Sequence, residues 1–301
     1  MKNPKIFYMG LLLLVTFFWG VTFPLIKITL GFISPVSFLV IRFLASSLLL
    51  LPFVIRNRSL RRARDIRLGI SAGFLLFLGY FFQTVGLNYT TASQSGIITG
   101  LYVVLLPFIS LIYLKLRPDR VSVLASFLAF AGLIVMSAGD LGNSGIQFGD
   151  VLTIISAVAY AFQIAYVSKY SSTLDTYVFT FYQLLSVAVF SSIFLPFMGS
   201  PFAINYFVVF TVLFTAIFAG IFAIFVSNKS LIYVEPTAAG VIFVGEPVFA
   251  AITSVIITGQ ELGIYTVIGG AVMIFAMFLT TFRNYLMGKR AIPNATAKIE
   301  S

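Results

Sequence analysis

Residues 6–28 read IFYMGLLLLVTFFWGVTFPLIKI, a run of 23 residues in which Lys27 is the only charged side chain. A helix needs about 20 apolar residues to cross the hydrocarbon core of a bilayer. Lys2 and Lys5 precede the run, as basic residues precede a signal peptide, but the run outlasts a signal-peptide core and no small-x-small cleavage site follows it. The stretch therefore predicts a membrane-spanning helix that stays in the protein.

Nine more apolar runs of similar length follow along the 301-residue chain. Hydrophobic residues make up 60% of the sequence and charged residues 9%, against about 25% charged residues in soluble domains. This composition excludes a soluble globular enzyme, a disordered chain and a disulfide-stapled domain. It predicts an all-α membrane protein with ten transmembrane helices, at about residues 6–28, 35–55, 68–87, 93–114, 121–138, 150–168, 176–197, 204–227, 236–258 and 263–282.

The sequence contains no histidine and no cysteine. Without histidine, the chain has no Ser-His-Asp triad, no His-ligated metal site and no histidine proton relay. Without cysteine, it has no thiol nucleophile, iron–sulfur cluster or disulfide. We therefore expect no catalytic residue, no metal site and no cofactor, and any proton transfer must use Asp, Glu, Lys or Tyr.

The basic residues divide unevenly between the two sides of the predicted membrane. Seventeen of the 19 Lys and Arg residues fall in the termini and in loops on the side of the N-terminus, including six arginines between residues 56 and 67. By the positive-inside rule, both termini of a multi-pass protein of the cell membrane are predicted to be cytoplasmic. Because the net charge of +10 lies in these short loops, it does not form the basic face of a soluble nucleic-acid-binding domain. No nucleic-acid partner is expected.

The two halves of the sequence resemble each other at a shift of 141–144 residues. A shift of 144 aligns Leu51-Pro52-Phe53 with Leu195-Pro196-Phe197, and a shift of 141 aligns Trp19 with Tyr160. These matches predict two five-helix repeats, residues 1–140 and 141–290, followed by a cytoplasmic tail of residues 291–301. Since five is odd, the second repeat must cross the membrane upside down relative to the first. Inverted repeats are typical of secondary transporters, which bind substrate near the midplane between the halves.

Short motifs recur in order along the chain, from Phe18-Trp19-Gly20 in the first run to Glu246-Pro247 and Gly259-Gln260-Glu261-Leu262 near the end. Together with Arg42-Phe43 and Tyr182-Gln183, they resemble the EamA-type ten-helix exporters of the drug/metabolite transporter superfamily. The resemblance covers nearly the whole chain. It implies an inverted-repeat fold that moves small organic metabolites, commonly amino acids, usually outward. Such proteins often carry an acidic residue after the fourth helix, where this chain has Lys115-Leu116-Arg117.

Glu246 and Arg42 are charged residues inside apolar runs, where a charge is costly unless it faces a cavity or a partner. Glu246, between Gly245 and Pro247, is the only acid well inside a predicted helix. It is a candidate for binding a substrate ammonium or a coupling proton, and a structural role beside the carbonyls that Pro247 frees is equally open. Arg42 would bind a carboxylate, or it would hold the two repeats together by pairing with Glu246 or with helix-end carbonyls.

Lys27, Pro24 and Pro247 are the further candidates for coupling or gating. Lys27 lies toward the outer end of the first helix, where a long side chain can reach the membrane interface. Anchoring at that interface and a place on the transport path are the two interpretations of Lys27. Pro24 predicts a kink in the same helix, and Pro247 predicts a break beside Glu246.

Uncharged polar side chains in the apolar runs complete the predicted site. Thr99 and Tyr102 share one helical stripe, and Tyr160 and Gln163 share another. Interhelical hydrogen bonding and aromatic packing are the alternative roles for such residues. The predicted substrate-binding set is Trp19, Gln83, Thr99, Tyr102, Tyr160, Gln163, Gln183 and Glu246.

These features predict a secondary transporter that exports small organic metabolites, amino acids or related amphipathic compounds, by alternating access between the two repeats. The expected partners are the lipid bilayer and a small-molecule metabolite, with protons as one candidate coupling ion and a monomer or homodimer as the assembly. A membrane-embedded enzyme is an alternative, but only scattered carboxylates are available for its chemistry. A structural membrane protein without transport activity is the other alternative.

Overall fold

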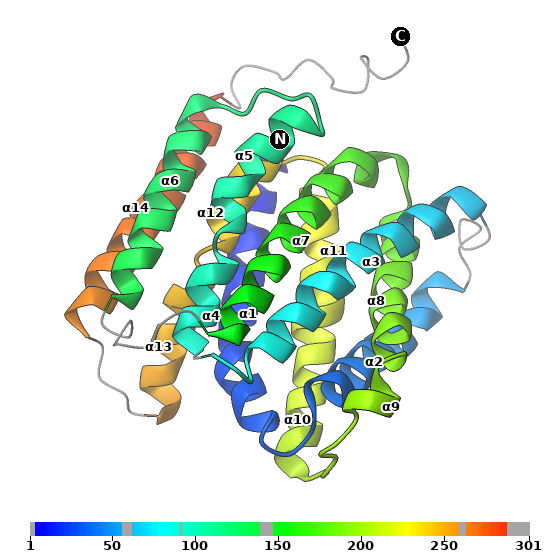
Figure 1. The fold of residues 1–301 in the computed structure, drawn as a ribbon. Coiled ribbons are helices and arrows are strands. Elements are labelled where there is room, and N and C mark those ends of the chain that lie inside the picture. Colours follow the sequence, from blue (N-terminus) through cyan, green and yellow to red (C-terminus); the bar gives the residue numbers. More distant parts are fainter. Residues whose placement is uncertain (1–3, 56–61, 91, 139–146, 259–262, 288–301) are drawn as a thin grey trace.

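The computed structural model describes residues 4–55, 62–90, 92–138, 147–258 and 263–287, which are helical apart from short connections (Figure 1). The predicted tail, residues 291–301, lies outside this part of the chain. The helices are α1 (Pro4–Thr29), α2 (Pro35–Val54), α3 (Ala63–Gly86), α4 (Ala92–Thr99), α5 (Tyr102–Ile112), α6 (Arg120–Ser137), α7 (Phe148–Tyr170), α8 (Thr176–Ser192), α9 (Leu195–Met198), α10 (Tyr206–Phe214), α11 (Ala223–Ser230), α12 (Pro236–Phe243), α13 (Glu246–Thr258) and α14 (Ile264–Met287).

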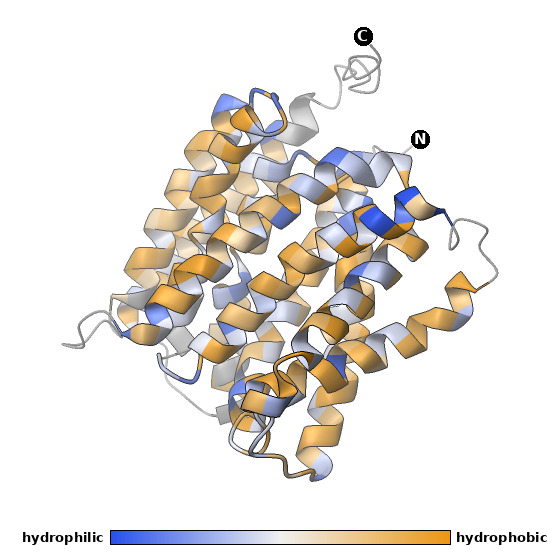
Figure 2. Cartoon of the chain, turned by 45° about the vertical axis from the view of Figure 1, so that its right-hand side comes forward, coloured by the Kyte–Doolittle hydropathy of each residue, from blue (hydrophilic) through white to orange (hydrophobic). Residues whose placement is uncertain are grey.

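The described helices coincide with the ten predicted apolar runs, and seven helical stretches are long and apolar enough to cross a membrane. Hydrophobic residues run along most of the helices, as the colours of Figure 2 show, and many large apolar side chains are exposed on their outer faces. Phe197 and Phe278, for example, are 83% and 62% exposed. Contiguous apolar surface of this extent needs lipid around it, because a soluble protein would bury it. The architecture is that of an all-α membrane protein, as the composition predicts.

Three of the predicted helices are interrupted, among them the run 176–197, which divides into α8 and α9 around Ile193-Phe194. The run 93–114 divides into α4 and α5 around Gly100-Leu101, and the run 236–258 divides into α12 and α13 around Val244-Gly245. At the break between α12 and α13, Pro247 offers no backbone donor, and its ring clashes with the carbonyl four residues back. Hydropathy averaged over a whole span does not resolve such breaks: α12 and α13 are similarly apolar, and the more polar α4 merges with the strongly apolar α5 in one run. A shift of 144 takes the last residue of α4 to the last of α12, and the first of α5 to the first of α13.

The run 204–227 is continuous but not uniformly α-helical. Residues Thr215–Phe222, between α10 and α11, are wound as a π-helix. The wider winding displaces carbonyls from their usual partners, and such segments are frequent at functional sites. Two side chains from the first half of the chain serve these carbonyls: Ser46 Oγ donates to Ala216 O over 3.0 Å, and Trp19 Nε1 donates to Ala219 O over 3.1 Å.

Helices from the two halves of the chain pack directly against each other. α6 lies along α14 at one edge of the molecule, and α2 and α3 lie against α8 toward the other (Figure 1). The backbones of α6 and α14 meet closely at Gly269, where a Cβ atom would overlap the backbone of Gly132 and Met136. α1 crosses α12 and α13 near the middle of the bundle. The start of α1 and the last turns of α14 lie at one end of the molecule, which we call the N-terminal end (Figure 1).

Candidate functional site

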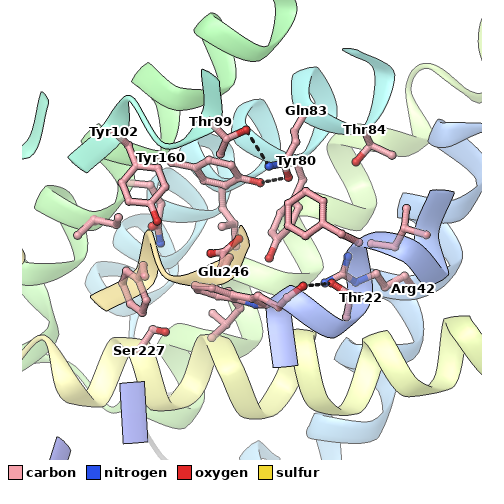
Figure 3. A pocket seen from close by; sticks show the side chains of 18 of the residues that line it. Thr22, Arg42, Tyr80, Gln83, Thr84, Thr99, Tyr102, Tyr160, Ser227 and Glu246 are labelled. Carbon is pink, nitrogen blue, oxygen red and sulfur yellow. Dashed lines mark hydrogen bonds between the residues drawn. The ribbon is translucent and has the colours of Figure 1, made fainter. Parts of the chain in front are cut away.

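A cavity of about 960 Å³, counting the space at its opening, lies between helices of both halves of the chain. Figure 3 shows its side chains, with Glu246 between Tyr102 on one side of the view and Arg42 on the other. Its lining includes Trp19, Thr22, Phe23, Arg42, Tyr80, Gln83, Thr84, Thr99, Tyr102, Tyr160, Gln163, Ser227, Asn228, Phe243 and Glu246.

A chain of hydrogen bonds ties three helices together on one wall. Tyr160 Oη of α7 donates to Gln83 Oε1 of α3 over 3.0 Å, and Gln83 Nε2 donates to Thr99 Oγ1 of α4 over 3.1 Å (Figure 3). Inside an apolar bundle, the oxygen and the nitrogen of a Gln amide both need hydrogen-bond partners. Tyr160 supplies the partner for the Gln83 oxygen and Thr99 the partner for its nitrogen. The network fixes the Tyr160 ring and the amide in place at the end of α4, where the helix is interrupted.

Arg42 is a buried cation surrounded by aromatic rings. Its guanidinium carbon lies 4.9 Å from the ring centre of Phe43, 5.1 Å from that of Tyr80 and 5.9 Å from that of Phe38. The side chain is 2% exposed, and its Nε atom has no hydrogen-bond partner. The faces of the rings attract the cation electrostatically, and this attraction is strongest where water is excluded. In the part of the chain that the structure describes, no carboxylate lies within 4 Å of Arg42, so the predicted pairing with Glu246 is not formed.

Glu246 is the first residue of α13, at the break in the ninth predicted helix. The free N–H groups at a helix start favour a negative charge. α1 passes this break closely: a Cβ atom on Gly20 would come 2.7 Å from the Glu246 carbonyl oxygen. Only a residue without a side chain allows that approach. Gly20 thereby lets Trp19, its neighbour in α1, line the same cavity as Glu246.

The model for the EamA-like transporter family matches residues 6–138 and matches again over residues 147–282. The chain belongs to this family. It is therefore a transporter of the drug/metabolite transporter superfamily, not an enzyme, and a multi-pass membrane protein built of two EamA domains. The boundary between the two matches falls between α6 and α7. α1–α6 thus belong to one domain and α7–α14 to the other, and the cavity lies where the two domains meet.

Relatives of this EamA-like transporter carry the same general description. An uncharacterized transporter of Archaeoglobus fulgidus is 36% identical over 272 residues, which cover 90% of this chain and 85% of the relative. The uncharacterized transporter YvbV of Bacillus subtilis is 34% identical over 177 residues, 58% of this chain and 57% of that protein. A crystal structure of 16% sequence identity superposes with a TM-score of 0.79 over 95% of this chain and 99% of its own, which shows that the fold is shared.

Most of the residues expected from the sequence to bind substrate line the cavity of this transporter, and four candidates do not. Gln183 is fully buried behind the wall, where its Oε1 accepts a hydrogen bond from Asn228 Nδ2 and its Nε2 has no partner. Lys27 Nζ donates to Leu87 O over 2.8 Å at the far ends of α1 and α3. Pro24 lies within α1 without ending it, and Pro247 lines a small recess next to the cavity.

Several residues that line the cavity were not predicted from the sequence. Tyr80 and Thr84 lie on α3 beside Gln83, at a spacing that puts Tyr80 on the same helix face, so helical periodicity was a usable signal for it. Ser227 and Asn228 fall at the end of the run 204–227, where polar residues are indistinguishable from the start of a loop. Thr22 donates to the Trp19 carbonyl over 2.7 Å within α1, and nothing in the sequence marks it.

Proposed function

We propose that this EamA-like transporter is a secondary transporter that exports small organic metabolites by alternating access, and that substrate binds in the cavity between the two domains. One observation carries the proposal. The cavity is lined from both domains, and it holds a buried cation and an acid, Arg42 and Glu246, that do not pair with each other. Charges in this position are costly to maintain, and a ligand that uses them accounts for their presence.

The membrane arrangement belongs to the same proposal. Ten spans form two inverted five-helix repeats, residues 1–140 and 141–290, with residues 291–301 as a tail and both termini in the cytoplasm. The matching interruptions support a duplication, because the repeat shift of 144 residues places Thr99 on Phe243 and Tyr102 on Glu246. Equivalent residues of the two repeats thus meet in one cavity, as expected for a substrate site on a pseudo-twofold axis.

The chemistry of the lining favours amino acids or related amphipathic compounds. Glu246 suits an ammonium group and Arg42 a carboxylate, through charge-assisted hydrogen bonds. Trp19, Tyr102 and Tyr160 supply aromatic faces for an apolar side chain, and Gln83, Thr99 and Gln163 supply hydrogen bonds. Gln183 acts on this site through Asn228 rather than by direct contact.

Coupling and gating are assigned to residues at or near the cavity. A proton carried by Glu246 is the proposed driving ion. Pro247 holds open the break at which Glu246 sits, and Lys27 links the far ends of α1 and α3 through its bond to Leu87. Pro24 lies between that link and Trp19, so a bend there would move the two ends of α1 independently.

The test is a counterflow screen in proteoliposomes. Vesicles loaded with unlabelled amino acids, nucleosides or cationic dyes are diluted into a trace of the labelled compound, and uptake is followed. We expect counterflow for a zwitterionic amino acid, abolished in the double variant Arg42→Gln with Glu246→Gln. Phe278→Leu, on a lipid-exposed face of α14, is the matched control and should retain full flux. Flux that survives in the double variant would remove the cavity as the substrate site.

A further inference from the structure

Four ionisable side chains meet at the N-terminal end of the molecule, apart from the central cavity. They are Lys5 of α1, Asp119 before α6, Glu235 before α12 and Arg283 in the last turns of α14. Arg283 Nη2 lies 3.5 Å from Asp119 Oδ1, while Asp119 Oδ2 caps α6 by accepting from the N–H groups of Val121 and Ser122. This N-terminal cluster joins both EamA domains, since α1 and α6 belong to the first and α12 and α14 to the second.

Glu235 is a half-buried member of the N-terminal cluster. It occupies the N-cap position of α12 without capping it, and its Oε1 atom is buried with no hydrogen-bond partner. Burial raises the pKa of Glu235 from its usual 4.5 to about 7; Lys5 acts to lower this pKa and the charge of Asp119 to raise it, while a backbone hydrogen bond from Asp119 acts to lower it. A carboxyl in this position exchanges its proton within the physiological range.

Apolar packing lies directly beneath the N-terminal cluster. The rings of Tyr8 and Tyr233 are stacked, with centres 4.4 Å apart and planes inclined by 5°. Leu12 of α1 is 0% exposed and Val234 2% exposed in the same layer. Leu231, one turn before Glu235, already lines the cavity. The start of α1 and the connection from α11 to α12 thus lie between the cavity and the N-terminal end of the molecule.

We infer that the N-terminal cluster and the Tyr8–Tyr233 stack form the gate of this end of the cavity, and that the gate closes when the Glu235 carboxyl holds a proton. The gate rests on the proposed transport function, because alternating access requires this end to open once in each cycle. Within the described residues, the charged groups that act on Glu235 are Lys5 and Asp119; Arg283 pairs with Asp119, and Tyr8 of α1 stacks on Tyr233 of the same connection as Glu235.

Thermodynamic linkage between proton binding at Glu235 and opening of the gate gives the direction of the pH dependence. Opening the gate would hydrate Glu235 and return its pKa toward 4.5, so the closed gate binds the proton more tightly than the open one. Lowering the pH through 7 therefore favours the closed gate, and raising it favours the open one. Between about pH 8 and about pH 6, a shift from 7 to 4.5 changes the ratio of open to closed molecules about tenfold.

The chain contains no cysteine, which permits a direct measurement. Val234→Cys places a thiol of similar size in the apolar layer, and its reaction with a maleimide in lipid nanodiscs reports gate opening. Tyr206→Cys, at a position 97% exposed, is the reference whose rate corrects for the pH dependence of the thiol itself. We expect the corrected rate at position 234 to be about tenfold higher near pH 8 than near pH 6.

Three further variants on the Val234→Cys background decide the assignment. Glu235→Gln mimics the protonated acid and should label slowly at both pH values. Lys5→Met should move the midpoint of the pH response upward and Asp119→Asn should move it downward, because these charges act oppositely on Glu235. Asp65→Asn, at a buried acid in the first turn of α3 outside the cluster, is the matched control and should leave the midpoint unchanged.

A pH response that persists in Glu235→Gln would overturn the inference, as would fast labelling of that variant at both pH values. Midpoints that move in the same direction in Lys5→Met and Asp119→Asn would overturn it too, and this comparison does not depend on whether Glu235→Gln folds. Labelling needs no substrate. A normal labelling response without counterflow of any compound would therefore count against the proposed transport activity and leave the gate standing.

Discussion

Replacing Glu246 by Gln keeps the shape of the side chain and removes its negative charge. If Glu246 binds the ammonium group of the substrate, the variant loses a charge-assisted hydrogen bond, which contributes about 1.5–3 kcal/mol. The dissociation constant of a cationic or zwitterionic substrate should then rise roughly 10- to 150-fold. The folded protein should be affected far less, because in the described part of the chain no ion pair joins Glu246 to Arg42.

A double-mutant cycle makes this expectation quantitative. Arg42→Gln removes the contacts of the guanidinium with the rings of Phe43 and Tyr80, 4.9 Å and 5.1 Å away, at a cost of about 2 kcal/mol. With Arg42 and Glu246 unpaired, the two stability changes should add in the double variant to within about 0.5 kcal/mol. Had the two charges been paired, either single variant would lose about 3–5 kcal/mol and the double would recover much of that loss.

The measurements are the melting temperature in detergent and the counterflow rate for both single variants and the double. Additive melting shifts together with a weakened substrate affinity in Glu246→Gln are the expected result. A strongly destabilised Glu246→Gln that is rescued by Arg42→Gln would refute the reasoning, because it would make Glu246 a structural partner of Arg42. Unchanged affinity in a stable Glu246→Gln would equally remove it from the substrate site.

Three other predictions concern the wall, the packing and the topology. Tyr160→Phe deletes the donor to Gln83 Oε1 and should lower the free energy of unfolding by about 1 kcal/mol, measured by thermal melting, with weaker counterflow; an unchanged protein would show that the bond is not formed. Gly269→Ala forces a methyl group against the α6 backbone and should cost about 1–3 kcal/mol, whereas Gly10→Ala, with nothing within 4 Å, should cost nothing. A cysteine at Arg117 should be labelled only from the cytoplasm and one at Tyr206 only from outside, and the reverse pattern would invert the proposed orientation.

The sequence predicts the helices well because membrane spans are long and their hydropathy is averaged over many residues. The prediction from hydropathy fails where the backbone departs from a regular α-helix inside a span. The break between α4 and α5 and the π-helix between α10 and α11 both lie within single runs of spanning length, so hydropathy averaged over a run does not locate them. Pro247 does indicate the break at Glu246. A proline inside a helix lacks a backbone donor and clashes with the preceding turn, so its presence in the sequence is enough to predict a break.

The polar residues of the cavity were predictable because few alternatives exist for an amide or a carboxylate in an apolar run. Which of them face the cavity was not, since that depends on the rotation of each helix against helices of the other domain. Gln83 and Gln183 look alike in the sequence, yet Gln83 lines the cavity and Gln183 lies behind Asn228.

Glu235, in contrast, was not predicted from the sequence to be a functional residue. It precedes a proline in a short connection, which the sequence indicates to be a hydrated loop, and the two charges that act on its pKa, Lys5 and Asp119, come from distant parts of the chain. The meeting of Lys5, Asp119 and Glu235 is a property of domain packing, so no local pattern carries it. The same packing brings Tyr102 and Glu246, equivalent positions of the two repeats, into one cavity. In the proposed inverted-repeat architecture, the 144-residue shift therefore relates Tyr102 to Glu246 across the cavity, whereas the partners of Glu235, Lys5 and Asp119, are not related to it by that shift.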